Sequence, residues 1–314
     1  MNIPVPSPPD GRLAILRLTV GAIAGLWWIG VSVLAQQGPK VFLSIVDRTG
    51  APITNLKTTE VTLVLDGMPC TSTKVEPIHW PMKLEVLIDN GDAMSTSISS
   101  LRNGLRSFFT EIPEDVETSL ITYSPQPRYV VKPTTNRQQL IKGIDFVSPN
   151  AGYGAKFLDA VSEAIGRTEK AKGDFFTTIM IVTTNDPEGS NGNLQAVVER
   201  MQEQIVKRPI TVHVIMLAIN SAQAVEKVSE AIQTQVGSDL SKNTGGRYET
   251  VALASKLPTM LSNFAHQIAH SNLLQSHQYR LSCDKSLSTA PTMSVWTSNP
   301  NVANVILSRD GAVP

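Results

Sequence analysis

Residues 84–94 read LEVLIDNGDAM, and this stretch decides the fold. Leu84 to Ile88 form a short, mostly apolar run that is typical of a buried strand. The segment from Ser95 to Phe109 then has a helical pattern, with serines at its start as capping residues. Functional residues of an open parallel sheet lie at the carboxyl ends of its strands. Asp89, which follows this strand directly, is therefore the first candidate site residue.

Strands and helices alternate along the chain from here to residue 269. Further strands are predicted at 118–123, 176–183, 210–219 and 247–250, and further helices at 156–168, 194–206, 225–235 and 255–269. The run from Phe176 to Thr183 is too apolar for an exposed sheet face, so we expect it to lie centrally. This alternation predicts an α/β domain over residues 81–272, with a doubly wound, mostly parallel sheet and helices on both faces.

Short β segments flank this domain on both sides. Strands are predicted at 41–46 and 61–65 in a lead-in segment, 36–80, and at 279–283 and 292–296 in a C-terminal segment, 273–314. Asp66-Gly67 is a strong hairpin-turn signal. Neither segment could bury much apolar surface alone. We expect the two to pack together into a small β unit, or to dock separately on the central domain.

The N-terminal 35 residues have the pattern of a secretory signal peptide. Arg12 and Arg17 precede an apolar run at 18–34. The small residue Ala35, directly before Gln36, stands at the expected cleavage site. The alternative is a retained membrane anchor formed by residues 18–34, although a span needs about 20 apolar residues. Both interpretations export the rest of the chain, to the periplasm or the cell exterior, and neither predicts any other membrane contact.

Composition and cysteine count narrow the classes of protein. The 314 residues are 41% hydrophobic and 17% charged, with a formal net charge of +0 and no basic run. This argues against nucleic acid as a partner, because phosphate binding calls for a basic excess or stripe. Export permits Cys70 and Cys283 to form a disulfide, and two unpaired, half-buried thiols are the alternative.

Three segments of the α/β domain resemble the metal-site segments of von Willebrand factor A domains. Residues 89–93 are similar to the D-x-S-x-S motif, 154–160 to G-T-x-L-x-D-A, and 181–185 to a strand that ends in T-D-G. Residues 47–56, 65–69, 244–248 and 277–281 resemble the flanking segments of a bacterial group of exported, VWFA-related proteins. The resemblance covers nearly the whole chain after residue 35 and implies the A-type fold.

The metal site that the resemblance implies is incomplete in this chain. Asp89 keeps the first carboxylate. The two serine positions fall on Gly91 and Ala93, the threonine position on Ala155 and the second aspartate on Thr184. Mg²⁺ needs protein oxygens as ligands, and one carboxylate with one hydroxyl supplies too few of them for stable binding. We therefore expect a degenerate metal site and no bound cofactor.

Two other metal sites are open alternatives. Asp92, Asp186 and Glu188 could hold Ca²⁺ at the same end of the sheet, although loop acids are mostly surface or helix-capping residues. His266 and His270 have the spacing of zinc ligands on one helix face, but histidines on the surface of an amphipathic helix explain the spacing equally well.

The sequence contains no nucleophile elbow and no phosphate-cradling loop, which argues against an enzyme. The leading hypothesis is a protein-binding or adhesion module that uses the loops after Ile88, Ser148 and Thr183. A structural subunit of a cell-envelope assembly, with the β segments as its docking surface, is the alternative. A metal-dependent adhesion domain, or a hydrolase that uses Asp89, Asp92 or a histidine, is a third class.

Overall fold

The computed structural model describes residues 41–70, 72–219, 232–283 and 292–313. The signal-peptide or anchor prediction for residues 1–35 lies outside these ranges, and so does most of the helix predicted at 225–235. Within the described ranges, no helix is long and apolar enough to cross a membrane.

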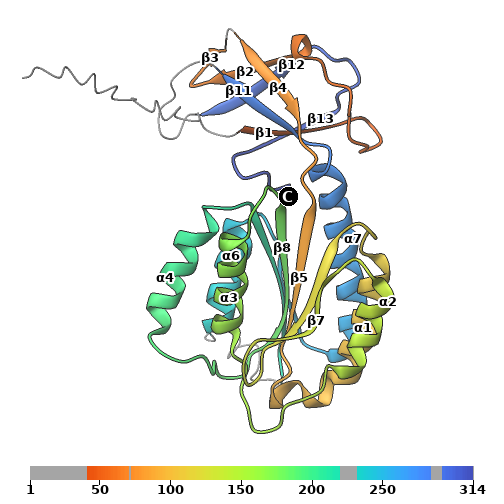
Figure 1. The fold of residues 1–314 in the computed structure, drawn as a ribbon, viewed down its shortest axis with the longest axis vertical. Coiled ribbons are helices and arrows are strands. Elements are labelled where there is room, and N and C mark those ends of the chain that lie inside the picture. The colour runs from red at the N-terminus through yellow and green to blue at the C-terminus, as the bar shows by residue number, and fades with distance from the viewer. Residues whose placement is uncertain (1–40, 71, 220–231, 284–291, 314) are drawn as a thin grey trace, which may run out of the picture. The chain divides into compact units, whose positions relative to one another are not determined.

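A six-stranded sheet forms the centre of the α/β part (Figure 1). In spatial order its strands are β10 (Tyr248–Val251), β9 (Ile210–Leu217), β8 (Phe176–Thr184), β5 (Met82–Ile88), β6 (Glu117–Thr122) and β7 (Arg128–Thr134). All neighbours run parallel except β7, which is antiparallel to β6 at one edge. Every residue of β8 is buried, which confirms the central position predicted from its apolar sequence.

Helices cover both faces of this sheet, as Figure 1 shows. One apolar layer contains side chains of α1 (Ile98–Glu111), α2 (Arg137–Gly143) and α7 (Leu257–Gln275). The other contains side chains of α3 (Phe157–Lys170), α4 (Leu194–Ile205) and α6 (Ile232–Asn243). Short 3-10 turns η2 (Asp92–Ser97), η3 (Ile144–Phe146) and η4 (Ala254–Lys256) precede or follow these helices. The predicted doubly wound α/β architecture is confirmed.

Two small sheets form the β unit. One contains β13 (Asn304–Ser308), β1 (Val41–Val46), β11 (Tyr279–Cys283) and β4 (Thr73–Pro77); the other contains β12 (Met293–Thr297), β2 (Val61–Leu65) and β3 (Met68–Pro69). The turn η1 (Thr58–Glu60) precedes β2. Each sheet pairs a strand from before the α/β domain with one from after it, β1 with β11 and β2 with β12. The prediction that the two chain ends pack together is confirmed.

Local features of the β unit agree with its sequence. Asp66 and Gly67 both have positive φ, at 49° and 75°, as a two-residue hairpin turn between β2 and β3 requires. Cys70, which follows β3, and Cys283, at the end of β11, are joined by a disulfide that links the two sheets.

Candidate functional site

Asp89 lies at the carboxyl end of β5 and is fully buried. Its Oδ1 accepts a hydrogen bond from the Gly91 N–H at 2.7 Å. Its Oδ2 accepts two more, from the Thr184 hydroxyl at 2.7 Å and from the Thr184 N–H at 3.2 Å. Burial raises the pKa of the Asp89 carboxyl above its ordinary value, although the hydrogen bonds from Gly91 and Thr184 oppose this rise. Both oxygens of the carboxylate therefore have donors from the protein itself.

Gly91 occupies a position that has no room for a larger residue. A Cβ at this residue would lie 2.8 Å from the Tyr153 carbonyl oxygen, and 3.1 Å from both Asp89 Oδ1 and Ser124 Oγ. The Asp92 N–H donates to the same Tyr153 oxygen at 3.0 Å. The turn around Tyr153 therefore fills the space next to Asp89 into which a serine side chain at position 91 would extend.

Side-chain amides tie the neighbouring loops together. Asn90 Oδ1 accepts from the Ser124 N–H at 2.9 Å, and its Nδ2 donates to the Ser148 carbonyl at 3.0 Å. Asn150 Nδ2 donates to the Ser124 carbonyl at 2.9 Å, and the Ser124 hydroxyl donates to the Gly154 carbonyl at 2.9 Å. The loops after β5 and β6 and the segment from Ser148 to Gly154 thus form one hydrogen-bonded assembly.

The structure brings together three of the five positions that the resemblance singles out: Asp89, Gly91 and Thr184. Ala155 is buried, and its carbonyl accepts from the Gly189 N–H at 2.6 Å. Ala93 lies half-buried in η2. Neither alanine carries an oxygen in its side chain, so neither side chain could anchor an ion.

The three acids proposed for a Ca²⁺ site have different surroundings. Asp92 is exposed, and its negative charge adds to burial in raising the pKa of Asp186. Burial also raises the pKa of Glu188, whose Oε1 accepts from the Ser190 N–H at 2.8 Å. Among the residues that the structure describes, no three His, Cys, Asp or Glu side chains gather closely enough to hold a metal ion.

His266 lies on α7 with its Nε2 3.7 Å from Glu111 Oε2. His270 follows one turn later on the same helix. The described part of the chain does not place these two histidines in a group of three potential metal ligands.

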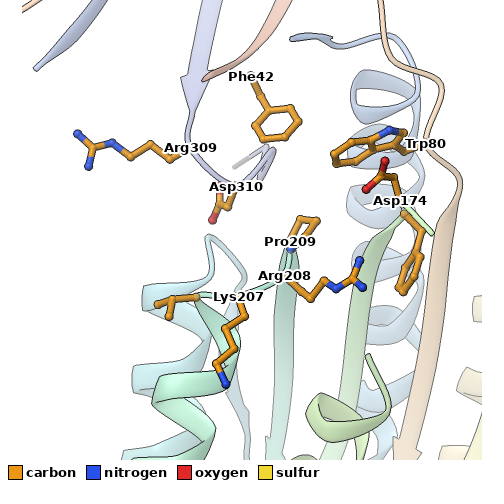
Figure 2. Close-up of a pocket in the computed structure, with 10 residues that line it drawn as sticks. Phe42, Trp80, Asp174, Lys207, Arg208, Pro209, Arg309 and Asp310 are labelled. Carbon is orange, nitrogen blue, oxygen red and sulfur yellow. The ribbon is translucent and has the colours of Figure 1, made fainter. Parts of the chain in front are cut away.

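A hollow of about 350 Å³ lies at the opposite, amino end of the sheet (Figure 2). Phe42 and Trp80 form its aromatic wall, and Figure 2 shows Lys207 directed away from both rings. Arg208 donates to the carbonyls of Ala171 and Gly173 at 2.7 and 2.8 Å, and Lys207 Nζ lies 2.7 Å from a carboxylate oxygen of Glu169. Protein groups already pair with the side chains of Arg208 and Lys207. This hollow is therefore a poor candidate for an anion-binding site.

No protein-family model and no curated protein matches the chain in sequence. Solved structures are similar in fold. The protein BatB from Bacteroides thetaiotaomicron is 12% identical, with 60% of this chain and 98% of that chain covered and a TM-score of 0.44. The vWF domain of the type V pili tip protein Mfa5 from Porphyromonas gingivalis is also 12% identical, with 61% and 96% covered and a TM-score of 0.45.

The pilus adhesin SpaC from Lactobacillus rhamnosus GG, in its open conformation, is 11% identical, with 76% of this chain and 36% of that chain covered and a TM-score of 0.48. At these identities and TM-scores the likenesses carry no inference about function. The fold rests on the topology of this chain itself. The sheet is mostly parallel with one antiparallel edge, helices cover both faces, and Asp89 lies at the end of a central strand. This topology agrees with the von Willebrand factor A-type fold that the sequence resemblance implies.

Proposed function

We propose that this chain is an exported, non-enzymatic module that binds a protein partner through the loops at the carboxyl end of the sheet, without a metal ion. The observation that carries the proposal is the state of Asp89. Its carboxylate, the one metal-site acid that the chain keeps, accepts hydrogen bonds from Gly91 and Thr184 on both oxygens.

A metal ion would have to displace these donors. Mg²⁺ demands near-octahedral oxygen coordination and dehydrates reluctantly, so it needs more than one anchoring carboxylate. The Thr184 hydroxyl donates a hydrogen bond to the Asp89 carboxylate. Thr184 is also neutral, whereas the aspartate expected at its position in the metal site would be negatively charged. The pocket at Gly91 is filled by the Tyr153 carbonyl. The hydrogen bonds thus hold the loops in place, which is what an ion would otherwise do.

The loops at this end of the sheet expose apolar side chains. Tyr153, in the turn packed against Gly91, is 52% exposed, and Leu253, which follows β10, is 61% exposed. Tyrosine is enriched among the residues that anchor protein interfaces. Because hydrogen bonds between Asn90, Ser124 and Asn150 fix the loops beforehand, a partner would meet a preformed surface, which lowers the entropic cost of binding.

A second candidate function has an observation of its own. Trp296, on β12 at the edge of the smaller sheet, is 65% exposed. This supports the alternative in which the β unit docks the chain into a cell-envelope assembly, because tryptophan is enriched among residues that anchor protein interfaces.

Quantitative capture of proteins from envelope extracts distinguishes the two functions. We expect Tyr153→Ala and Leu253→Ser to reduce the captured partner at least tenfold, while Trp296→Ala, a matched change of an exposed apolar residue, leaves it unchanged. Capture should also be the same in Mg²⁺ and in EDTA. Loss of capture in EDTA would contradict metal independence, and loss only with Trp296→Ala would favour the structural role.

A further inference from the structure

A groove of about 390 Å³ lies between the helix α2 and the edge strand β7. The two elements are in close contact beside it, since a Cβ at Gly143 of α2 would collide with the side chain of Val131 on β7. Val130 and Phe146 give the groove an apolar wall. Phe146, on the turn η3, is 76% exposed. Because water solvates apolar surface poorly, a ligand that covers this ring gains binding free energy.

The strand β7 itself is a poor template for a strand added by a partner. Its pairing with β6 is irregular at two places, between Thr118 and Leu120 and between Leu120 and Ile121. The strand also contains Pro133, which has no N–H to donate. Irregular pairing and proline at a sheet edge both oppose edge-to-edge association. We therefore expect a ligand in the groove to be bound mainly by side chains.

Two carboxamides on α2 give the groove its capacity for hydrogen bonds. Gln138 and Gln139 line it, and both are exposed. Neither side chain is hydrogen-bonded to another of the residues that the structure describes, since Gln139 uses only its backbone N–H, which donates to Asn136. A carboxamide carries a donor and an acceptor, the same pair that a peptide group presents. These two side chains can therefore bond to the backbone of an extended peptide.

The charge of the groove is positive, and among the described residues no acidic side chain lines it. Its charged lining residue is Lys142 of α2, which is exposed and forms no ion pair within the described part of the chain. Residues 118–144, which include β7 and α2, contain four basic residues and no acidic one. Asp145, next in the chain, is already paired with Arg106 at 2.5 Å. The groove therefore favours a negatively charged group at Lys142.

We propose that this groove binds an extended, acidic segment of a partner protein. An apolar side chain of the segment covers the Phe146 ring, a nearby carboxylate pairs with Lys142, and the backbone of the segment bonds to Gln138 and Gln139. A nucleic acid fits less well, because a single cation lines the described groove and a phosphate backbone calls for several. The groove shares no side chain with the loop surface proposed above to bind a partner, so either site can exist without the other.

The apolar contact and the charge can be tested separately in the full chain. The probes are two sets of short, fluorescently labelled peptides, one of random Asp, Glu, Leu and Phe and one in which Lys and Arg replace the acids. Fluorescence polarisation measures their binding. Phe146→Ser and Lys142→Glu should each weaken binding of the acidic set at least tenfold, because the first removes the apolar anchor and the second brings like charges together. Both residues are exposed, so the melting temperature should stay the same.

Two matched variants serve as controls. Lys242→Glu reverses the charge of a lysine in the last turn of α6, as Lys142→Glu does in α2, but α6 packs against the opposite face of the sheet. Val206→Ser removes an apolar side chain that is 82% exposed, directly after α4 on that same opposite face. Neither control should change the affinity for the acidic peptides.

The proposal predicts that the unchanged chain binds the acidic set, that binding weakens as salt is raised, and that both groove variants lose it. It would be overturned if the unchanged chain bound no acidic peptide, if it bound the basic set equally well, or if both groove variants bound normally. Tighter binding of a short DNA duplex than of the peptides would overturn the assigned class of partner. Protein capture by the loops should be the same in Phe146→Ser and Lys142→Glu, so a failure here is distinguishable from a failure of the proposed loop function.

Discussion

His213 is a buried histidine in β9 that the fold holds in its neutral form. It is 2% exposed, its Nδ1 accepts from the Arg247 N–H at 3.1 Å, and its ring lies edge-on to Phe264 at 5.7 Å. Burial, and to a smaller extent the positive charge of Arg247, lower the pKa of His213 to about 4. Sequence patterns did not indicate this residue, because its protonation depends on what is packed around β9.

Acid should therefore destabilise the protein through His213. The unfolded chain takes up a proton near pH 6.5 while the folded chain does so near 4, so stability is lost as pH falls through this window. The full loss is about 3 kcal/mol, at about 1.4 kcal/mol for each pKa unit. Urea unfolding at pH 7 and pH 4.5 measures it. His213→Asn, which keeps an acceptor for the Arg247 N–H, should flatten this part of the pH profile, whereas His266→Asn, at an exposed site, should not. Parallel profiles for the two variants would contradict the assignment.

Thr184 should stabilise the fold chiefly through Asp89. Thr184→Val keeps the shape of the side chain but removes the hydroxyl that donates to the buried carboxylate at 2.7 Å. Hydrogen bonds to charged groups contribute about 1.5–3 kcal/mol, so we expect a loss of unfolding free energy in this range. In an Asp89→Asn background the same change should cost much less, as a double-mutant cycle by chemical denaturation would show. Equal costs in both backgrounds would mean that the hydroxyl acts independently of Asp89.

The sequence indicated only part of this site. Asp89, Gly91 and Thr184 could be placed together because the carboxyl ends of neighbouring parallel strands meet at one edge. Asn90 and Asn150 could not be identified, since each side chain bonds to the backbone of a loop distant in sequence. Their one visible signal is their position in turn-forming stretches, which asparagine favours for local reasons as well.

The contact between helices α1 and α7 depends on a glycine in the middle of α1. A Cβ at Gly104 would lie 2.6 Å from Leu261 Cδ1 and 3.1 Å from the Pro258 Cα on α7. By contrast, a Cβ at Gly166 in α3 would meet nothing within 4 Å. The two glycines have the same helical setting but opposite surroundings.

Alanine at these two positions should therefore have opposite effects. Gly166→Ala should stabilise the protein by up to about 1 kcal/mol through helix propensity alone. Gly104→Ala gains the same propensity but overpacks the α1–α7 contact, which costs about 1–3 kcal/mol, so its net effect should be destabilising. Thermal unfolding of both variants decides the matter. Stabilisation by Gly104→Ala would show that the two helices separate at little cost.

Elements with strong apolar patterns were predictable, and those with weak patterns were missed. The strand β8 is buried throughout and was placed correctly from its sequence. The strand β7 has one fully buried residue, Val131, and contains Pro133, so it shows no clear alternation. The helix α2 has only seven residues. The described part of the helix α6 runs from Ile232 to Asn243, well past the predicted end at 235. Its buried residues include polar Gln233 and Ser241, which obscure the apolar period.

At the scale of the whole molecule, the β unit closes the chain on itself. Its core combines β1 and β2 with β11 and β13, segments from before and after the α/β domain. The association of the two ends could be inferred, because neither buries enough apolar surface alone. The register could not, since pairs such as Val41 with Leu281 depend on contacts that no local pattern records.

The disulfide between Cys70 and Cys283 strengthens this closure. It joins residues 213 positions apart, and a loop of this length restricts the unfolded chain by about 5 kcal/mol in the entropy model. Protein that is denatured without reductant should contain no titratable thiol, and the variant Cys70→Ala with Cys283→Ala should lose several kcal/mol of unfolding free energy. Reductant should lower the unfolding midpoint of the unchanged chain and leave that of the double variant where it is. Two reactive thiols in the denatured chain would instead mean that strand pairing and apolar contacts alone hold the two ends together.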